Sequence, residues 1–278
     1  MKNKTNRQEK LEAITAQLEQ GVKDVFTSEK WAAYLQTMAR FHNYSFQNCL
    51  LISMQCPEAS LIAGYKKWAE FNRNVVKGQK AIRILAPIYK QIEEEVTGLD
   101  GTKEKRTRQR LVNFRTVPVF DLSQTEGEPL PSVCKTLTNK VEGFNFILEK
   151  LEKVAPVEVC FGDIKDSANG YFSPCEEKIV VKHSLPELQK IKTLVHETAH
   201  AILHCIDGEE AKTDQRTKEV EAEAVAYTVL QYLGLESSDY SFGYIAGWAG
   251  DKDIPQLKNS LEIIRRTANT IIEGFEAA

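Results

Sequence analysis

The segment "LVHETAHAILH", Leu194–His204, carries the residues best suited to chemistry. At its centre His196, Glu197 and His200 spell H-E-x-x-H. Residues four apart share one face of a helix, so the two imidazoles can bind one tetrahedral zinc ion. Glu197 lies beside the open coordination position, where it can take a proton from the metal-bound water as a general base. The spacing therefore predicts a hydrolytic metal site.

The same pattern also fits a helix with two ordinary histidines, because so short a motif arises by chance. Apolar residues on both sides of the motif favour the metal, since they predict a mostly buried helix whose ionisable side chains need partners. His204 repeats the four-residue spacing once more. It is interpreted as a capping or core histidine, or as a group behind the ligands.

A third protein ligand is required, and the predicted helix Glu219–Leu233 offers Glu219, Glu221 and Glu223. At about 100° per residue the apolar side chains of this helix form one stripe. Glu219 and Glu223 fall on that stripe, whereas Glu221 points away from it. Carboxylates on an apolar face are costly without a cation. We therefore favour Glu219 as the ligand and Glu223 as the carboxylate that orients an imidazole, with the reverse assignment left open.

This half of the chain resembles the ImmA/IrrE-type gluzincin metallopeptidases. The motif is followed by Glu219-Val-Glu-Ala222-Glu223-Ala-Val-Ala226, similar to the E-x-x-A-[NDE]-x-x-A helix of that family. The resemblance implies Glu219 as the ligand, and strands in "GYFSPCEEKIVV" whose edge holds an extended substrate. Glu223 departs from the more common Asn or Asp. Tyr171 and Tyr244 are candidate donors to the oxyanion.

A stretch near the N-terminus interleaves cations with aromatic side chains, the two ingredients that grip unpaired DNA. The cations are Lys66, Lys67, Arg73, Lys77, Lys80 and Arg83, and the aromatic residues are Tyr65, Trp68 and Phe71. Stacking is worth about 1–3 kcal/mol per base. Trp68 and Phe71, however, are three apart and also fit the core face of a helix. Composition alone favours that structural role.

Residues 43–87 resemble the N-terminal single-stranded DNA (ssDNA)-binding domain of ArdC-type antirestriction proteins, and more closely their LtrC-like relatives on conjugative elements. The matching positions are Tyr44, Ser45, Asn48, Leu51, the Trp68 helix, Val75–Ile82 and, later, Val119, Phe120 and Asp121. With "SDYSFGYIAGW" the likeness covers nearly the whole chain. It implies an ssDNA partner, for which the candidate binding residues are Tyr44, Asn48, Lys67, Trp68, Arg73, Lys77 and Lys80.

The elements that must position these residues form an α+β fold in two domains. Helices are predicted over most of residues 1–56. The β-rich runs Ala81–Leu85 and Leu111–Leu122 then flank a charged loop and predict a hairpin with a basic tip. We place an α/β ssDNA-binding domain at residues 1–125, a linker at 126–136 and a gluzincin-like metallopeptidase domain at 137–278.

Composition limits the possible partners and location. The 278 residues are 27% charged and 42% hydrophobic, with a net charge of −3, so DNA contact must come from a local basic surface. The six cysteines include no CxxC pair, which favours reduced thiols. No apolar run approaches the roughly 20 residues of a membrane span, and the polar N-terminus lacks a signal sequence. We expect a cytoplasmic protein without membrane contact.

Three functions fit these observations. The first is a mobile-element, antirestriction-type protein that binds ssDNA and cleaves a protein substrate at a zinc site. The second is a non-enzymatic ssDNA-binding or escort protein whose metal site is structural or idle. An open coordination position and Glu197 argue against a structural zinc, which four protein ligands usually close. A plain helical scaffold ranks last, because it leaves Glu219 and Glu223 without a cation.

Overall fold

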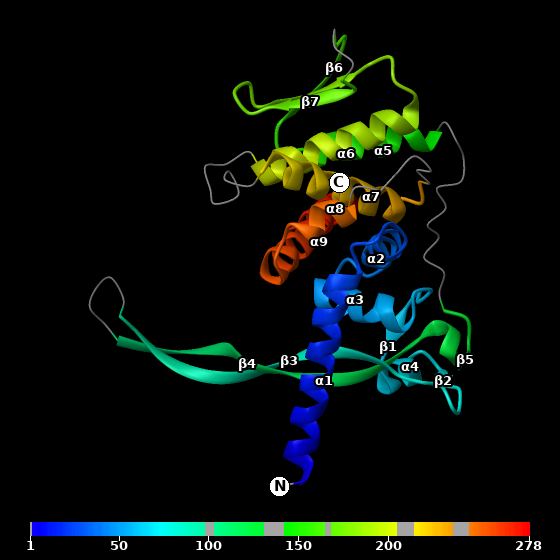
Figure 1. Cartoon of the computed structure of the whole chain (residues 1–278), viewed down its shortest axis with the longest axis vertical. Helices are drawn as coiled ribbons and strands as arrows, with labels where there is room; N and C mark the ends of the chain where they lie inside the picture. The colour runs from blue at the N-terminus through cyan, green and yellow to red at the C-terminus, as the bar shows by residue number, and fades with distance from the viewer. Residues whose placement is uncertain (1, 98–102, 131–141, 165–167, 205–213, 236–244) are drawn as a thin grey trace.

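Helices from both halves of the chain form one body, and strands lie at two of its sides (Figure 1). The computed structural model describes residues 2–97, 103–130, 142–164, 168–204, 214–235 and 245–278. The N-terminal helices are α1 (Lys2–Asp24), α2 (Ser28–Arg40), α3 (Phe46–Gln55) and α4 (Tyr65–Glu70). The C-terminal helices are α5 (Glu142–Val154), α6 (Glu187–His204), α7 (Gln215–Tyr232), α8 (Ile245–Gly250) and α9 (Ile254–Ala277). This confirms the mixed helix and sheet class.

The N-terminal strands centre on a long antiparallel ribbon. Strand β3 (Ile82–Thr97) pairs with β4 (Lys103–Asp121), and the short β1 (Ile62–Ala63) joins the other edge of β4. The hairpin is confirmed, but most of the predicted charged loop is strand. Acidic and basic residues lie opposite each other there, as in the pairs Glu94–Arg106 and Glu95–Lys105.

A second, small sheet shows where the N-terminal unit ends. Strand β2 (Arg73–Val75) pairs with β5 (Thr125–Gly127), and the Arg73 guanidinium donates to the carbonyls of Thr125, Gly127 and Glu128. The first residues assigned to the linker, Glu126 and Gly127, therefore belong to this sheet.

The C-terminal sheet has the order β6-β8-β7. Strand β6 (Glu158–Gly162) runs parallel to β8 (Lys178–Lys182), whereas β7 (Gly170–Ser173) is antiparallel to it and forms an edge. The sheet covers α6 (Figure 1). The predicted strand pair is thus present, with its edge strand beside the helix that carries H-E-x-x-H.

One hydrophobic core spans the two predicted domains. Helix α2 packs on α7, and both α1 and α3 contact α9. Trp31 and Trp248, from opposite ends of the chain, are both almost fully buried in this core. Polar contacts also join the two predicted domains, for example the hydrogen bond of 3.1 Å from Gln36 Nε2 to the Tyr227 hydroxyl. In the described residues no helix combines the length and apolar character needed to cross a membrane.

Asp121 ties the end of the ribbon to the body. Its side chain is 1% exposed and accepts hydrogen bonds from the backbone N–H groups of Ser60, Leu61 and Ser123. Burial alone raises the pKa of this carboxyl, but the hydrogen bonds outweigh it and hold the pKa below its ordinary value. The charged form is therefore the one that the fold stabilises.

We expect Asp121→Ala to lower the free energy of unfolding by about 2–4 kcal/mol, because several buried N–H groups lose their acceptor. The stability that the lowered pKa of Asp121 contributes is fully present above about pH 4, and it is lost as the pH falls through that pKa. Urea denaturation at pH 7 and pH 3 measures both effects, with the exposed Asp163→Ala as the control. Equal stability of the two variants at pH 7 would contradict this role.

Candidate metal centre

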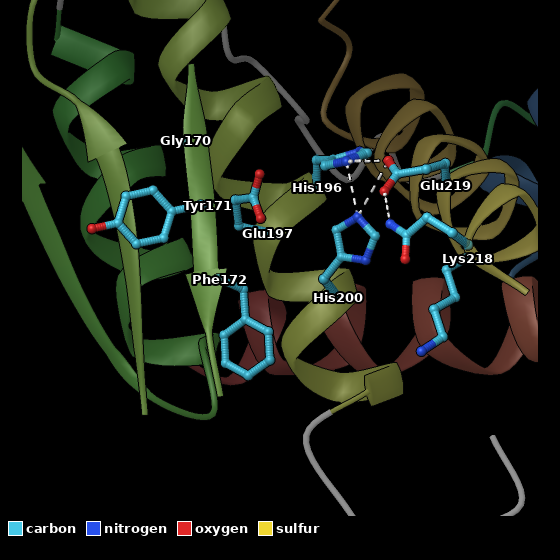
Figure 2. A pocket seen from close by; sticks show the side chains of 9 residues that line it. Gly170, Tyr171, Phe172, His196, Glu197, His200, Lys218 and Glu219 are labelled. Carbon is cyan, nitrogen blue, oxygen red and sulfur yellow. Dashed lines mark hydrogen bonds and ion pairs between the residues drawn. The ribbon is translucent and has the colours of Figure 1, made fainter. Parts of the chain in front are cut away.

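Helices α6 and α7 pack together and turn their ionisable side chains toward each other. On α6 the neighbours of the motif, Leu194, Val195 and Ala199, are fully buried, which fixes the rotation of the helix. His196 and His200 then lie one turn apart, facing Glu219 near the start of α7 (Figure 2). Asp214 caps α7 by accepting from the Thr217 N–H, so the start of that helix is held in place.

The donor atoms of these three residues have the spacing of metal ligands. The Nε2 atoms of His196 and His200 are 3.1 Å apart. Glu219 Oε2 lies 3.5 Å from the first nitrogen and 3.6 Å from the second. Ligands at 2.0–2.1 Å from a tetrahedral ion are separated by about 3.3 Å. The three side chains thus fit a divalent cation without rearrangement.

Each acid on α7 has a second contact that fixes its orientation. Gln215 Nε2 donates to Glu219 Oε1 over 2.7 Å, which leaves Oε2 as the oxygen that faces the histidines. Glu223 Oε2 lies 3.3 Å from His196 Nδ1, and its Oε1 lies 3.2 Å from Lys192 Nζ. The Nδ1 contact is at ion-pair distance but is not aligned as a hydrogen bond. Glu219, not Glu223, is therefore the acid beside both Nε2 atoms.

Glu221 shows that the predicted apolar stripe on this helix was too narrow. Helices α2, α6 and α9 all pack on α7, so most of its circumference is covered. Glu221 is only 3% exposed although it lies off the predicted stripe. The helical phase correctly distinguished Glu219 and Glu223, which face α6, from Glu221. It did not predict that Glu221 is buried.

The pKa values of the cluster follow from burial and from neighbouring charge. Burial raises the pKa of Glu197 above its ordinary value, and the two histidines offset part of that rise. Burial lowers the pKa of His196, but the carboxylates of Glu219 and Glu223 outweigh it and raise the pKa to about 9. The two histidines, whose Nε2 atoms lie 3.5 and 3.6 Å from its Oε2, hold the pKa of Glu219 well below its ordinary range. Without a metal, a proton on His196 thus balances the acids.

The site opens into a cleft of about 440 Å³ bordered by the edge strand β7. Phe172 donates its backbone N–H to the Glu197 carboxylate. A Cβ on Gly170 would lie 2.5 Å from Thr193 Cγ2 and 2.9 Å from the Val180 carbonyl, so only glycine lets the strand approach α6 this closely. A second hollow of about 350 Å³, lined in part by Asn169 and Lys192, continues past Glu197. The cleft can therefore accept an extended chain.

Of the two predicted oxyanion donors, the structure describes only Tyr171. The Tyr171 hydroxyl points away from His196 and Glu219 (Figure 2). Tyr244 and the side chain of His204 lie outside the described residues. Two residues that contact the site were missed, Gln215 and Lys192. Gln215 lies four residues before Glu219, and Lys192 lies four residues before His196. Helical spacing could therefore have predicted that both lie near the site.

Comparisons with known proteins agree with this division of the chain. A sequence profile for the N-terminal domain of the anti-restriction factor ArdC matches residues 4–120, and one for the IrrE N-terminal-like domain of the M78 peptidases matches residues 152–237. The chain has the ArdC-type two-domain architecture. An uncharacterized protein of Bacillus anthracis is 28% identical in a match that covers 86% of this chain and 46% of that protein. The chain thus spans about half the length of this relative.

Two solved structures share the fold. The metal-free structure of the antirestriction ArdC protein from the R388 plasmid matches with a TM-score of 0.52 at 18% identity, covering 83% of this chain and 85% of that one. The Mn(II)-bound structure of the same protein matches with a TM-score of 0.57 at 16% identity, covering 92% and 97%. A chain with the same fold therefore holds a divalent ion.

Three of the predicted DNA-binding residues have structural roles in this ArdC-type fold. Trp68 is fully buried and its Nε1 donates to the Phe120 carbonyl, so the prediction that it stacks on bases was wrong. Asn48 is 8% exposed and bonds both the N–H and the carbonyl of Leu85, which fixes β3 to α3. The contacts of Arg73 with β5, given above, likewise occupy its guanidinium.

The remaining four candidates differ in exposure. Tyr44 is half-buried and packs edge-on against Phe41. Lys67 is exposed and pairs with Glu70 at 2.8 Å. Lys77 and Lys80 are exposed. Only the lysines of the predicted set thus remain fully accessible to a phosphate.

The two acids on α7 are expected to differ in their effect on metal binding. Glu219→Ala should abolish stoichiometric zinc, because it removes a donor atom. Glu223→Gln should weaken zinc about 10–100-fold, because it loosens the orientation of an imidazole. Elemental analysis after dialysis, together with competition against a zinc chelator, measures both, and the exposed Glu187→Ala is the control. A larger loss in Glu223→Gln than in Glu219→Ala would reverse the assignment.

Metal binding at pH 7 should also release a proton. With a pKa of about 9, His196 is mostly protonated in the metal-free protein, and it must be neutral to coordinate through Nε2. Titration calorimetry with zinc in PIPES and in HEPES, two weakly coordinating buffers that differ in ionisation enthalpy, separates the proton release from the binding heat. Glu223→Gln should release fewer protons, because one of the carboxylates that raises this pKa is gone. An equal release from both proteins would contradict this origin of the shift.

Proposed function

We propose that the chain is a mobile-element, antirestriction-type protein that binds ssDNA and carries a zinc-dependent peptidase site. One observation supports the peptidase most strongly. The three donor atoms, a buried Glu197 and the edge of β7 converge on a single cleft. A histidine pair alone occurs in many helices, but a general base and a substrate-binding strand beside it are what hydrolysis of a peptide requires.

The donor set suits zinc. Two imidazoles and one carboxylate oxygen are ligands that zinc accepts in catalytic sites, where three protein ligands leave a position open. His196, His200 and Glu219 would hold the ion, and Gln215, Glu223 and Lys192 would keep two of those ligands in orientation. When bound, such an ion makes a water molecule more acidic and polarises a carbonyl group.

Glu197 and β7 would perform the remaining steps. The raised pKa of Glu197 suits a group that accepts a proton from the attacking water and then donates it to the leaving amine. The free edge of β7 would pair with the substrate backbone and place a peptide bond between this carboxylate and the donor set. Because backbone pairing is independent of side chains, we expect an unfolded or extended segment of protein as the substrate.

Binding of ssDNA is the second activity. It is supported by the match of residues 4–120 to the ArdC N-terminal domain and by exposed cations in that half. We place both activities in the cytoplasm. Cys49, Cys56, Cys160 and Cys175 are free thiols, which fits a reducing compartment.

Replacing Glu197 separates the two functions. With β-casein as the probe, Glu197→Gln should retain zinc and lower the rate of cleavage by at least about 100-fold, because the general base is lost. Glu187→Gln, an exposed change on the same helix, should cleave like the wild type. Both variants should bind ssDNA normally.

Two results would count against the peptidase. Cleavage by Glu197→Gln at the wild-type rate would exclude this residue as the base. A zinc-loaded wild type that cleaves nothing, with or without ssDNA, would favour the alternative of a non-enzymatic ssDNA-binding or escort protein with an idle or structural metal site.

A further inference from the structure

The middle of the β3–β4 ribbon, residues 82–92 and 107–117, is a surface that the predicted DNA-binding set did not include. The ribbon extends past the helical body (Figure 1). Large apolar side chains along it remain exposed: Tyr89 by 54%, Leu111 by 46% and Phe114 by 38%. An isolated two-stranded ribbon is only marginally stable, and it gains nothing from apolar side chains left in water. Side chains exposed in this way indicate a binding surface.

Strand pairing sorts the side chains of this surface onto two faces. Tyr89 lies opposite Leu111, and Pro87 lies opposite Phe114. Paired residues share a face, and residues two apart on one strand share it too. The irregularity between Ile88 and Tyr89 places the extra residue on β4 and keeps both pairs on the same side. One face of the ribbon is therefore aromatic and apolar.

The other face of the ribbon carries basic side chains. Lys90 lies directly opposite Arg110, and Arg108 and Arg115 lie on the same face. Like charges directly opposite each other destabilise a ladder unless an anion lies between them. Neither Lys90 nor Arg110 forms an ion pair within the described ranges. Residues 82–92 and 107–121 contain one acidic residue, Asp121. It is buried at the root of the ribbon, away from these basic side chains.

We propose that the middle of this ribbon is the principal ssDNA-binding surface of the chain, with unpaired bases stacked on Tyr89 and Phe114 and phosphates held by Lys90 and Arg110. The inference rests on the proposed ssDNA binding and gives it a location. Strands in a ribbon are about 4.8 Å apart, so long basic side chains from one face reach a phosphate at its edge. A single strand can thus contact both faces.

The aromatic face favours binding of single strands over duplexes. Bases in a duplex already stack on one another and offer no free face to Tyr89 or Phe114, whereas unpaired bases do. A purely electrostatic arm would need only the basic face. The Trp68 ring, by contrast, is buried and cannot stack on a base.

The test measures binding of the full chain to a fluorescein-labelled 20-nucleotide oligo(dT) and to a 20-base-pair duplex, by fluorescence anisotropy at several salt concentrations. Tyr89→Ala/Phe114→Ala should weaken ssDNA binding at least about tenfold, as expected for two lost stacking contacts. Tyr89→Phe/Phe114→Tyr should restore it, since the rings remain. Lys90→Gln/Arg110→Gln should reduce the slope of log K against log salt by about 1.4, the value for two phosphate contacts. Lys77→Gln/Lys80→Gln tests the predicted segment after Trp68, and Lys23→Gln/Lys153→Gln, at exposed lysines outside both surfaces, is the charge-matched control that should bind like the wild type.

The outcomes separate the inference from the function on which it rests. Failure of the wild type to bind oligo(dT) would exclude ssDNA binding altogether. Normal binding by both ribbon variants, with loss in Lys77→Gln/Lys80→Gln, would leave ssDNA binding intact and overturn its assignment to the ribbon. Equal loss of oligo(dT) and duplex binding in Tyr89→Ala/Phe114→Ala would contradict the stacking of unpaired bases.

Discussion

The charge balance between α6 and α7 is the constraint on which the rest of the site depends. Two histidines and two glutamates face one another in a partly buried space, and none of them is stable there alone. A proton on His196 balances the acids when no metal is present, and a divalent cation would balance them better. Gln215, one turn before Glu219 on α7, and Lys192 on α6 each hold one of the two acids in orientation. The helix pair therefore maintains a cation-binding arrangement as part of its packing.

The shared hydrophobic core extends that constraint to the whole chain. Helix α7, which carries both acids, packs on α2 from the N-terminal half as well as on α6 and α9. The sequence divides into two matched domains, but the core does not. Changes in the position of the N-terminal helices would thus act directly on the helix that holds Glu219. The ribbon is different, because its buried residues, among those described, lie at its root, where Ile82 and Ile84 are buried and Asp121 anchors the chain, while α1 also contacts β4.

Much of the metal centre could be predicted because helical spacing alone determines it. Residues four apart share a face, so His196, His200 and the choice of Glu219 over Glu221 followed from periodicity. The depth of Glu221 could not be predicted, since it depends on three helices distant in sequence. The DNA-binding residues were harder for the same reason. Whether Trp68 stacks on a base or fills the core depends on β1 and β4, which lie on either side of it in sequence.

The ribbon shows a second limit of sequence patterns. Alternation of side chains in β3 and β4 was visible, but the register that places Lys90 opposite Arg110 depends on one extra residue in β4. A shift of one residue would reverse the faces. Charge also misled the prediction, because a run rich in Lys and Arg is typical of a loop, whereas here residues 103–110 belong to β4.

X-ray absorption spectroscopy of the zinc-loaded chain would show whether α6 and α7 hold an open metal site with three protein ligands. For such a site we expect two imidazole nitrogens, a carboxylate oxygen bound through one atom, and a further light-atom ligand from solvent, all at about 2.0–2.2 Å. A sulfur ligand at about 2.3 Å, or a third imidazole, would mean a site closed by other residues, and it would contradict the proposed peptidase centre.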